Sequence, residues 1–432
     1  MRSRLLWRRS ATAVGLYAAV ALGLLGTVVA SRVLGIDRFG VYATALVAAY
    51  FVQALLDLTV EESLTKFGFR YVAAEDWARL HRLFRLTLRL KLLGGLLGTV
   101  VLVLFAPFAN AVFGTSGLEA PVLASALLPI VQAPEGVAST ALLLRGRYDL
   151  RGWYLTFSMA LRLAAIVVGV QFGVWQAIAC LVVAQAVSTA VVSVVGLRAF
   201  RRFPTAAPRP LDEDRGAIKS FVVQSSLVTG LLSLRGALAP VLLGIVASPT
   251  QVGLSRIAQA PQAGLSAASS PVRLVLLTEH TRDWEHGLER EVLQGVRRYM
   301  VAAAGLMAIV LPVFLLLMPL LVRIVFGPTY EGAVAAARII LVAAALQVVL
   351  GWTKSLPVSI GRPWLRLLTH GIETAVLLPF VIWLGYTMGV TGAAIATLIS
   401  TVAFALAWCV VLYRLHVEVA ARARAPREAV ES

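Results

Sequence analysis

The sequence predicts an all-α integral membrane protein with about twelve transmembrane helices in two six-helix lobes. Three observations lead to this fold class. Of the 432 residues, 59% are hydrophobic and only 14% are charged, which is more apolar surface than a soluble domain can bury. About twelve apolar runs are long enough to cross a hydrocarbon core of about 30 Å. Short motifs of the first half also recur, in the same order, in the second half, which indicates an internal repeat.

The first predicted span follows the basic segment MRSRLLWRRS. Its apolar run of about 20 residues is longer than the core of a typical signal peptide, so we expect it to be retained as a transmembrane helix. The borders between the fifth and sixth runs, and between the eleventh and twelfth, are narrow. The runs lie near residues 11–30, 41–60, 90–111, 120–144, 152–173, 175–197, 219–246, 252–276, 299–322, 333–358, 364–386 and 389–413.

The distribution of lysine and arginine predicts the orientation in the membrane. Of 39 such residues, 30 lie on one side, 6 lie inside spans, and only Arg32, Arg38 and Arg323 lie on the other side. Basic residues concentrate in cytoplasmic segments, so we expect both termini in the cytoplasm. This asymmetry explains most of the net charge of +17 without a nucleic-acid partner. The basic segments are the N-terminus, 61–91, 145–151, 198–219, 279–298, 361–366 and the tail from 414.

Several functions are disfavoured by what the sequence contains. Cys180 and Cys409 both lie in apolar runs without a partner motif, so we expect neither a metal site nor a disulfide framework. The predicted outer loops have about ten residues or fewer, too few for the catalytic loop of a polyprenyl-sugar ligase or polymerase. The sequence also carries no nucleotide-binding loop motif. We therefore expect neither an enzyme nor a bound cofactor.

Five motif pairs define the internal repeat. RFGVYATAL aligns with QVGLSRIAQ, which places Gly40 over Gly253 at an offset of 213 residues, and VFG recurs at the same offset. We interpret Gly40 and Gly253 as helix starts after a short outer turn, and the VFG glycines as helix ends. The other pairs are Gly146-Arg147 with Gly361-Arg362, Gly173-Val174 with Gly389-Val390, and Asp76-Trp77 with Asp283-Trp284, at offsets of 215, 216 and 207.

The repeat predicts the domain organisation. An N-terminal six-helix lobe is expected at 1–200 and a C-terminal six-helix lobe at 218–432, joined by a charged, proline-rich cytoplasmic linker at 201–217. Because each unit has six spans, the two lobes enter the membrane in the same orientation and should be related by a pseudo-twofold axis along the membrane normal. This plan suits alternating access between two lobes.

Motifs along most of the chain resemble those of a transporter family. SRVLGIDRFGVYATALVAAYFVQALLDL is similar to the opening of polysaccharide and O-antigen type flippases, and VFGPTYEGAVAAARIILVAA and GRPWLRLL are similar to their second half. These flippases belong to the multidrug/oligosaccharidyl-lipid/polysaccharide exporter superfamily. The resemblance implies two six-helix lobes around a central cavity and export of a lipid-linked oligosaccharide. Many relatives have an aspartate in the seventh helix where this chain has Arg235, which argues against carrying over a cation-coupling role for such an acid.

Charges inside the spans mark the candidate site, because ionisable residues in a membrane are costly and usually functional. The predicted substrate-binding residues are Arg162, Arg235, Arg256 and Arg338. None has a charged twin at the repeat offset, so we interpret them as additions to a common scaffold that face the cavity. Arg256 and Arg338 lie near outer ends and could instead reach the head groups. Arg235 could instead form a structural salt bridge to Glu135 or Glu373.

The acids in the spans are candidates for an ion pair or for coupling to an ion. Glu135 follows Pro134 in a span already broken by Pro129, and we favour its pairing with an arginine over proton transfer. Glu373 lies one turn after His370, while Asp57 lies near Glu61 and Glu62 in a partly hydrated cytoplasmic cluster. Gln53, Gln132, Gln224 and Gln262 could contact sugar hydroxyls or form bonds between helices.

The sequence therefore favours a flippase of the inner membrane. It would move an anionic polyprenyl-(pyro)phosphate-linked oligosaccharide from the cytoplasmic to the outer leaflet for cell-surface polysaccharide synthesis. A buried arginine suits this cargo because its guanidinium can bind phosphate through two parallel hydrogen bonds. The alternatives are a drug/cation antiporter of the same superfamily and a non-transporting scaffold of a polysaccharide assembly complex. We expect a monomer, with membrane lipid and polysaccharide assembly proteins as further partners.

Overall fold

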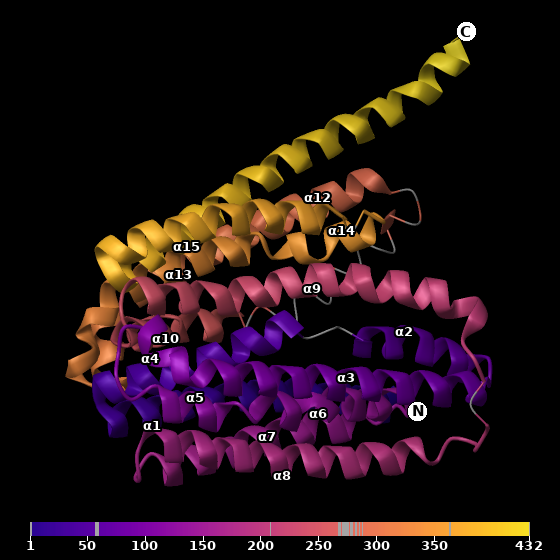
Figure 1. Cartoon of the computed structure of the whole chain (residues 1–432). Coiled ribbons are helices and arrows are strands. Elements are labelled where there is room, and N and C mark those ends of the chain that lie inside the picture. Colours follow the sequence, from indigo (N-terminus) through magenta and orange to yellow (C-terminus); the bar gives the residue numbers. More distant parts are fainter. Residues whose placement is uncertain are drawn as a thin grey trace. The chain divides into compact units, whose positions relative to one another are not determined.

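The computed structural model of the chain is built mainly of helices (Figure 1). It describes residues 2–431 except 57–59, 208, 267–268, 270–275, 277–279, 281–282, 285, 287 and 363. The chain forms two compact units, residues 1–253 and 254–432. The helices of the first unit are α1 (Arg2–Leu56), α2 (Val60–Ala73), α3 (Trp77–Phe105), η1 (Ala106–Phe108), α4 (Ala109–Val112), α5 (Glu119–Ser125), α6 (Leu128–Leu144), α7 (Tyr148–Gly169), α8 (Val174–Phe200) and α9 (Asp212–Val246).

The second unit contains the two long helices α12 and α15 together with shorter ones. Helix α10 (Pro249–Ala258) connects the two units. The helices that follow are α12 (Glu289–Val325), η2 (Pro328–Ala333), α13 (Val334–Val349), η3 (Gly351–Lys354), α14 (Leu356–Ser359) and α15 (Trp364–Glu431). The edge-to-face pair of Trp352 and Trp408, with ring centroids 5.2 Å apart, lies in the buried core of this unit.

The helices agree with the predicted membrane spans. Among the described residues, eight segments are long and apolar enough to cross a membrane. Two of them contain a glycine at which the helical path breaks, Gly35 in α1 and Gly389 in α15, so each of these segments provides two of the predicted spans. The predicted spans at 219–246 and 252–276 correspond to α9 and to the stretch that begins with α10. Part of the eighth span lies outside the described residues.

The repeated glycines have positive φ in both halves of the chain. Each of three aligned pairs has positive φ, a region that glycine enters without steric cost. This confirms that the VFG glycines end helices, because Gly114 closely follows α4 and Gly327 follows α12. The pairs are Gly114 with Gly327, Gly146 with Gly361, and Gly173 with Gly389.

Gly40 and Gly253 are in direct contact. A Cβ atom on Gly253 would lie 3.1 Å from the Cα of Gly40, and one on Gly40 would lie 2.6 Å from the carbonyl oxygen of Pro249. Gly40 follows the break at Gly35 and Gly253 lies in the first turns of α10, so both are helix starts, as the sequence predicts. Close by, Thr250 Oγ1 donates a hydrogen bond of 2.9 Å to Asp37 Oδ1.

The first compact unit extends beyond the predicted N-terminal lobe. Helix α9 packs on α1 and α2, so residues up to 253 belong to this unit. The lobe boundaries at 200 and 218, which rest on the repeat, remain a prediction.

Candidate functional site

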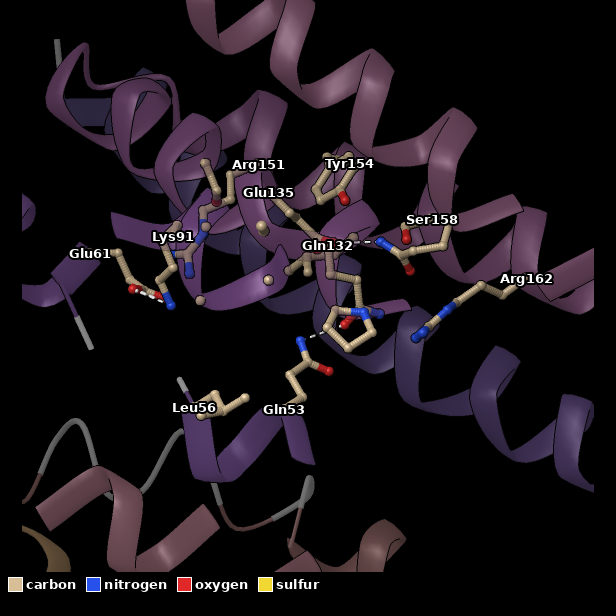
Figure 2. Close-up of a pocket in the computed structure, with 18 of the residues that line it drawn as sticks. Gln53, Leu56, Glu61, Lys91, Gln132, Glu135, Arg151, Tyr154, Ser158 and Arg162 are labelled. Carbon is tan, nitrogen blue, oxygen red and sulfur yellow. Dashed lines mark hydrogen bonds and ion pairs between the residues drawn. The ribbon is translucent and has the colours of Figure 1, made fainter. Parts of the chain in front are cut away.

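The first unit contains a polar pocket of about 360 Å³ (Figure 2). Helices α1, α2, α3, α6, α7 and α8 all contribute to its lining. Three cations, Lys91, Arg151 and Arg162, and two carboxylates, Glu61 and Glu135, line it. The ionisable side chains of the lining therefore leave an excess of one positive charge at neutral pH.

One face of α7 supplies much of the polar lining. Arg151, Tyr154, Ser158 and Arg162 all line the pocket, and their spacing follows the 3.6-residue period of a helix. Arg151 and Arg162 are eleven residues apart, so they lie within about 20° of each other around the helix and about 16 Å apart along it. Figure 2 shows the two arginines at different ends of the pocket. The face can therefore present two guanidinium groups to one elongated ligand.

Neither guanidinium group is saturated by hydrogen bonds. Arg162 Nη2 lies 3.4 Å from the hydroxyl of Tyr50, and Arg162 also interacts electrostatically with Glu135. The Nε atoms of Arg151 and Arg162 are both buried and have no hydrogen-bond partner among the described residues. A buried guanidinium donor without a partner is costly, and an anionic ligand would supply the missing acceptors.

An ion pair occupies the end of the pocket nearest to Arg151. Lys91 Nζ on α3 lies 2.7 Å from Glu61 Oε2 on α2. The carboxylate reaches this position beside α6, where a Cβ on Gly136 would lie only 3.0 Å from Glu61 Oε1. The missing side chain at Gly136 therefore makes room for Glu61.

Amide side chains cross-link the helices around the pocket. Gln53 Nε2 donates a hydrogen bond of 2.8 Å to Gln132 Oε1, which joins α1 to α6. The second unit has a related bond of 3.4 Å from Gln262 to Gln347.

Glu135 has an amide as a hydrogen-bond partner. Gln185 Nε2 donates a hydrogen bond of 2.7 Å to Glu135 Oε2, so this partner of Glu135 is a neutral amide rather than the arginine that the sequence favours. Gln224 bonds Ser220 within α9.

The other predicted site residues are not part of the pocket lining, or lie outside the described residues. Arg235 lies in α9, and its side chain is outside the described residues, as is Asp57. Arg256 is exposed on α10. In the second unit, His370 Nδ1 lies 2.9 Å from Glu373 Oε2 and its ring stacks on Phe404. His370 is thus a packed, hydrogen-bonded residue, and Glu373 is almost completely buried beside it.

Arg338 has a structural partner. Its Nε atom donates a hydrogen bond of 2.9 Å to the carbonyl oxygen of Leu315 on α12. In a regular helix this carbonyl would accept from the backbone N–H of residue 319, but that residue is Pro319, which has none. Arg338 therefore satisfies a carbonyl that the proline leaves unpaired.

We expect Arg338→Met to destabilise the protein by about 1–2 kcal/mol, because the Leu315 carbonyl loses its donor. The same substitution should cost much less in a Pro319→Ala background, where the helix supplies the donor. Thermal unfolding of the two single variants and the double variant measures this coupling. Equal costs in both backgrounds would contradict the role assigned to Arg338.

Two of the three cations that line the pocket are not among the residues predicted from the sequence. Lys91 and Arg151 lie at the ends of the basic segments 61–91 and 145–151, for which the sequence predicts a cytoplasmic location. In the structure α3 and α7 begin before these residues, so both side chains lie on helices beside the pocket. The spacing of Arg151, Tyr154, Ser158 and Arg162 is visible in the sequence and would have indicated this polar face.

Comparisons with known proteins show the class of fold. The sequence matches no model of a protein family and no curated protein. Its structure is similar to an inward-facing multidrug resistance MATE family transporter of the MOP superfamily, with a TM-score of 0.68, 14% identity and coverage of 94% of this chain and 99% of that chain. A MATE transporter from Vibrio cholerae matches with a TM-score of 0.60, 14% identity and coverage of 96% and 97%.

A third similar structure is a MOP superfamily transporter from Pyrococcus furiosus. It matches with a TM-score of 0.61, 14% identity and coverage of 96% of this chain and 95% of that chain, and the reverse polarity of its binding pocket is described as suggesting a different function for that protein. The chain therefore has the all-α, two-lobe membrane fold of MOP superfamily transporters. This is the fold of the superfamily that the sequence motifs resemble.

Proposed function

We propose that the protein is a flippase that moves an anionic polyprenyl-(pyro)phosphate-linked oligosaccharide from the cytoplasmic to the outer leaflet by alternating access. The observation that carries this proposal is the polar pocket with Arg151 and Arg162 on one face of α7. Buried guanidinium donors that have no acceptor among the described residues suit phosphate oxygens, and the neighbouring hydroxyl and amide groups suit a sugar. Of the four arginines that the sequence suggests, Arg162 has the strongest structural support.

The charge of the pocket bears on the main alternative. The similarity to multidrug MATE transporters supports a drug/cation antiporter, and a cationic drug would require an excess of carboxylates. The described pocket has the opposite excess. This polarity favours an anionic cargo. Arg235 and Arg256 remain proposed contacts of the same cargo elsewhere along its path.

Flipping in liposomes tests the proposal. Purified protein is reconstituted with a fluorescent polyprenyl-diphosphate sugar, and the label in the outer leaflet is quenched over time. We expect protein-dependent flipping that free inorganic pyrophosphate inhibits, because both anions would compete for the same guanidinium groups. Parallel vesicles that contain a cationic dye test the antiporter.

The outcomes separate the three functions. Flipping of the diphosphate lipid without dye transport supports the flippase. Dye transport without flipping would establish the antiporter, and absence of both from correctly folded protein would favour the scaffold. We expect the cell membrane as the location, with both termini in the cytoplasm, which a protease-accessibility assay on tagged termini would check.

A further inference from the structure

Helix α2 connects the polar pocket to α9. Its first turn holds Glu61, which pairs with Lys91 in the pocket, and the rest of the helix packs against α9. Helix α9 is also the first helix of the predicted C-terminal lobe. A ligand that displaces Glu61 in the pocket can therefore affect α2 and, through α2, also α9.

Several contacts fasten α2 to α9. Tyr71 Oη donates a hydrogen bond of 2.9 Å to Asp214 Oδ2, and Arg70 Nη1 lies 3.2 Å from Asp214 Oδ1. Asp214 is only 8% exposed, and Arg79 of α3 approaches its Oδ2 at 3.8 Å. Burial, together with the bond to Asp214, raises the pKa of Tyr71, so its hydroxyl remains a donor at physiological pH. These contacts join the C-terminal end of α2 to the start of α9.

Further contacts lie closer to the pocket. Phe67 packs edge-to-face on Phe221 with ring centroids 6.0 Å apart, and Lys66 Nζ lies 4.3 Å from the centroid of the Phe221 ring. Ser225 on α9 donates a hydrogen bond to Glu62, the residue next to Glu61. Because α2 is a short helix held to α9 along its length, a displacement of its first turn must be passed to α9 or break these contacts.

In the ion pair with Lys91, the Glu61 carboxylate occupies the position that the phosphate of an anionic ligand would take. The lysine is mostly buried, with a side chain that is 10% exposed, whereas the Glu61 side chain is 29% exposed. A phosphate that enters the pocket would compete with the Glu61 carboxylate for the same cation. Lys91 would exchange one anionic partner for another, whereas Glu61 would lose its cation.

We infer that Glu61 is a positioning residue that an incoming anion displaces from Lys91, and that α2 transmits this displacement to α9. The inference rests on the proposed function, because it requires an anionic ligand in the pocket. It assigns Lys91 as a third contact of the ligand phosphate, with Arg151 and Arg162. Glu61 then lowers the affinity for the ligand while it couples binding to the movement of α9.

Two variants of the ion pair test this inference with opposite effects on binding. The probe is geranyl diphosphate, titrated calorimetrically into purified full-length protein. Glu61→Gln should bind it about five- to tenfold more tightly, because no carboxylate has to be displaced, yet flip the lipid-linked sugar more slowly. Lys91→Gln should bind the probe more weakly. A merely structural pair would predict equal or weaker binding for both. Glu119→Gln removes an exposed carboxylate on α5 and should change neither binding nor flipping.

Hydrogen exchange of residues 60–73 tests the transmission step. In the wild-type protein, geranyl diphosphate should increase amide exchange in α2. In both pair variants, exchange should already be raised without the probe and respond little to it. The inference is overturned if the wild-type protein binds the probe without a change in α2, or if Glu61→Gln does not tighten binding. Failure of the folded wild-type protein to bind any diphosphate would overturn the proposed function as well, so the two failures are distinguishable.

Discussion

Arg162→Ala is expected to reduce flipping of the lipid-linked sugar by about 10- to 100-fold. The guanidinium lies in the polar pocket with its Nε atom buried and without a hydrogen-bond partner among the described residues. A charge-assisted hydrogen bond to phosphate is worth about 1.5–3 kcal/mol, which corresponds to this range of rates. Arg162→Lys should retain part of the activity, because it keeps the charge and loses the planar fork. Initial flipping rates in liposomes measure both effects.

The matched control is Arg198→Ala. Arg198 is exposed in the last turn of α8, so its loss should leave flipping and thermal stability unchanged. The Arg162 variants should also unfold near the wild-type temperature, because no salt bridge of 4 Å or less to Arg162 is found in the described part of the chain. Unchanged flipping by stable Arg162→Ala protein would remove this residue from the binding site.

Gly40→Ala is expected to lower stability by about 1–3 kcal/mol, the usual cost of overpacking a tight contact. The new Cβ would lie 2.6 Å from the Pro249 carbonyl oxygen and 2.8 Å from the Cα of Thr250. Both are backbone atoms, so no side chain can rotate away. The unfolding temperature of detergent-solubilised protein measures the loss.

Gly23→Ala, in the part of α1 that precedes the break at Gly35, is the matched comparison. A Cβ at this position meets nothing within 4 Å, so alanine should be neutral or stabilise the helix by up to about 1 kcal/mol. Opposite effects of the same substitution at residues 23 and 40 would separate the contact from helix propensity. If the two variants unfolded alike, Gly40 would not be required for close packing.

Much of the fold could be predicted from the sequence because the membrane imposes simple rules. Long apolar runs gave the spans, and the repeated glycines marked helix ends that have positive φ in both halves of the chain. Of the two roles that the sequence leaves open for the glutamines, bonds between side chains of different helices are found for Gln53 with Gln132 and for Gln262 with Gln347. These features depend on local sequence or on a repeat that is visible along the chain.

The candidate site was harder to predict, because it depends on where helices continue and which of them meet. The sequence places Lys91 and Arg151 in cytoplasmic segments outside the spans, because an apolar run ends at a charge even where the helix continues. The pair of Glu61 and Lys91 joins α2 to α3, and its space beside α6 depends on Gly136. Neither the ion pair nor the space at Gly136 produces a periodic pattern in the sequence, so neither could be predicted from it. Conversely, the sequence marks Arg338 as a candidate because it is a charge in a span. In the structure it donates to the Leu315 carbonyl, which lacks its helical donor because of Pro319 on α12.

The contact between Gly40 and Gly253 bears on the origin of the chain. The two glycines are 213 positions apart, the offset of the repeat, and the hydrogen-bonded residues Asp37 and Thr250 are separated by the same number. In an assembly of two copies of a half-length ancestor, each pair would be one residue meeting its own copy, as at the centre of an isologous interface. Identical aspartates would repel each other there. Fusion of the two copies into one chain allows the positions to diverge, so that a carboxylate can face a hydroxyl donor.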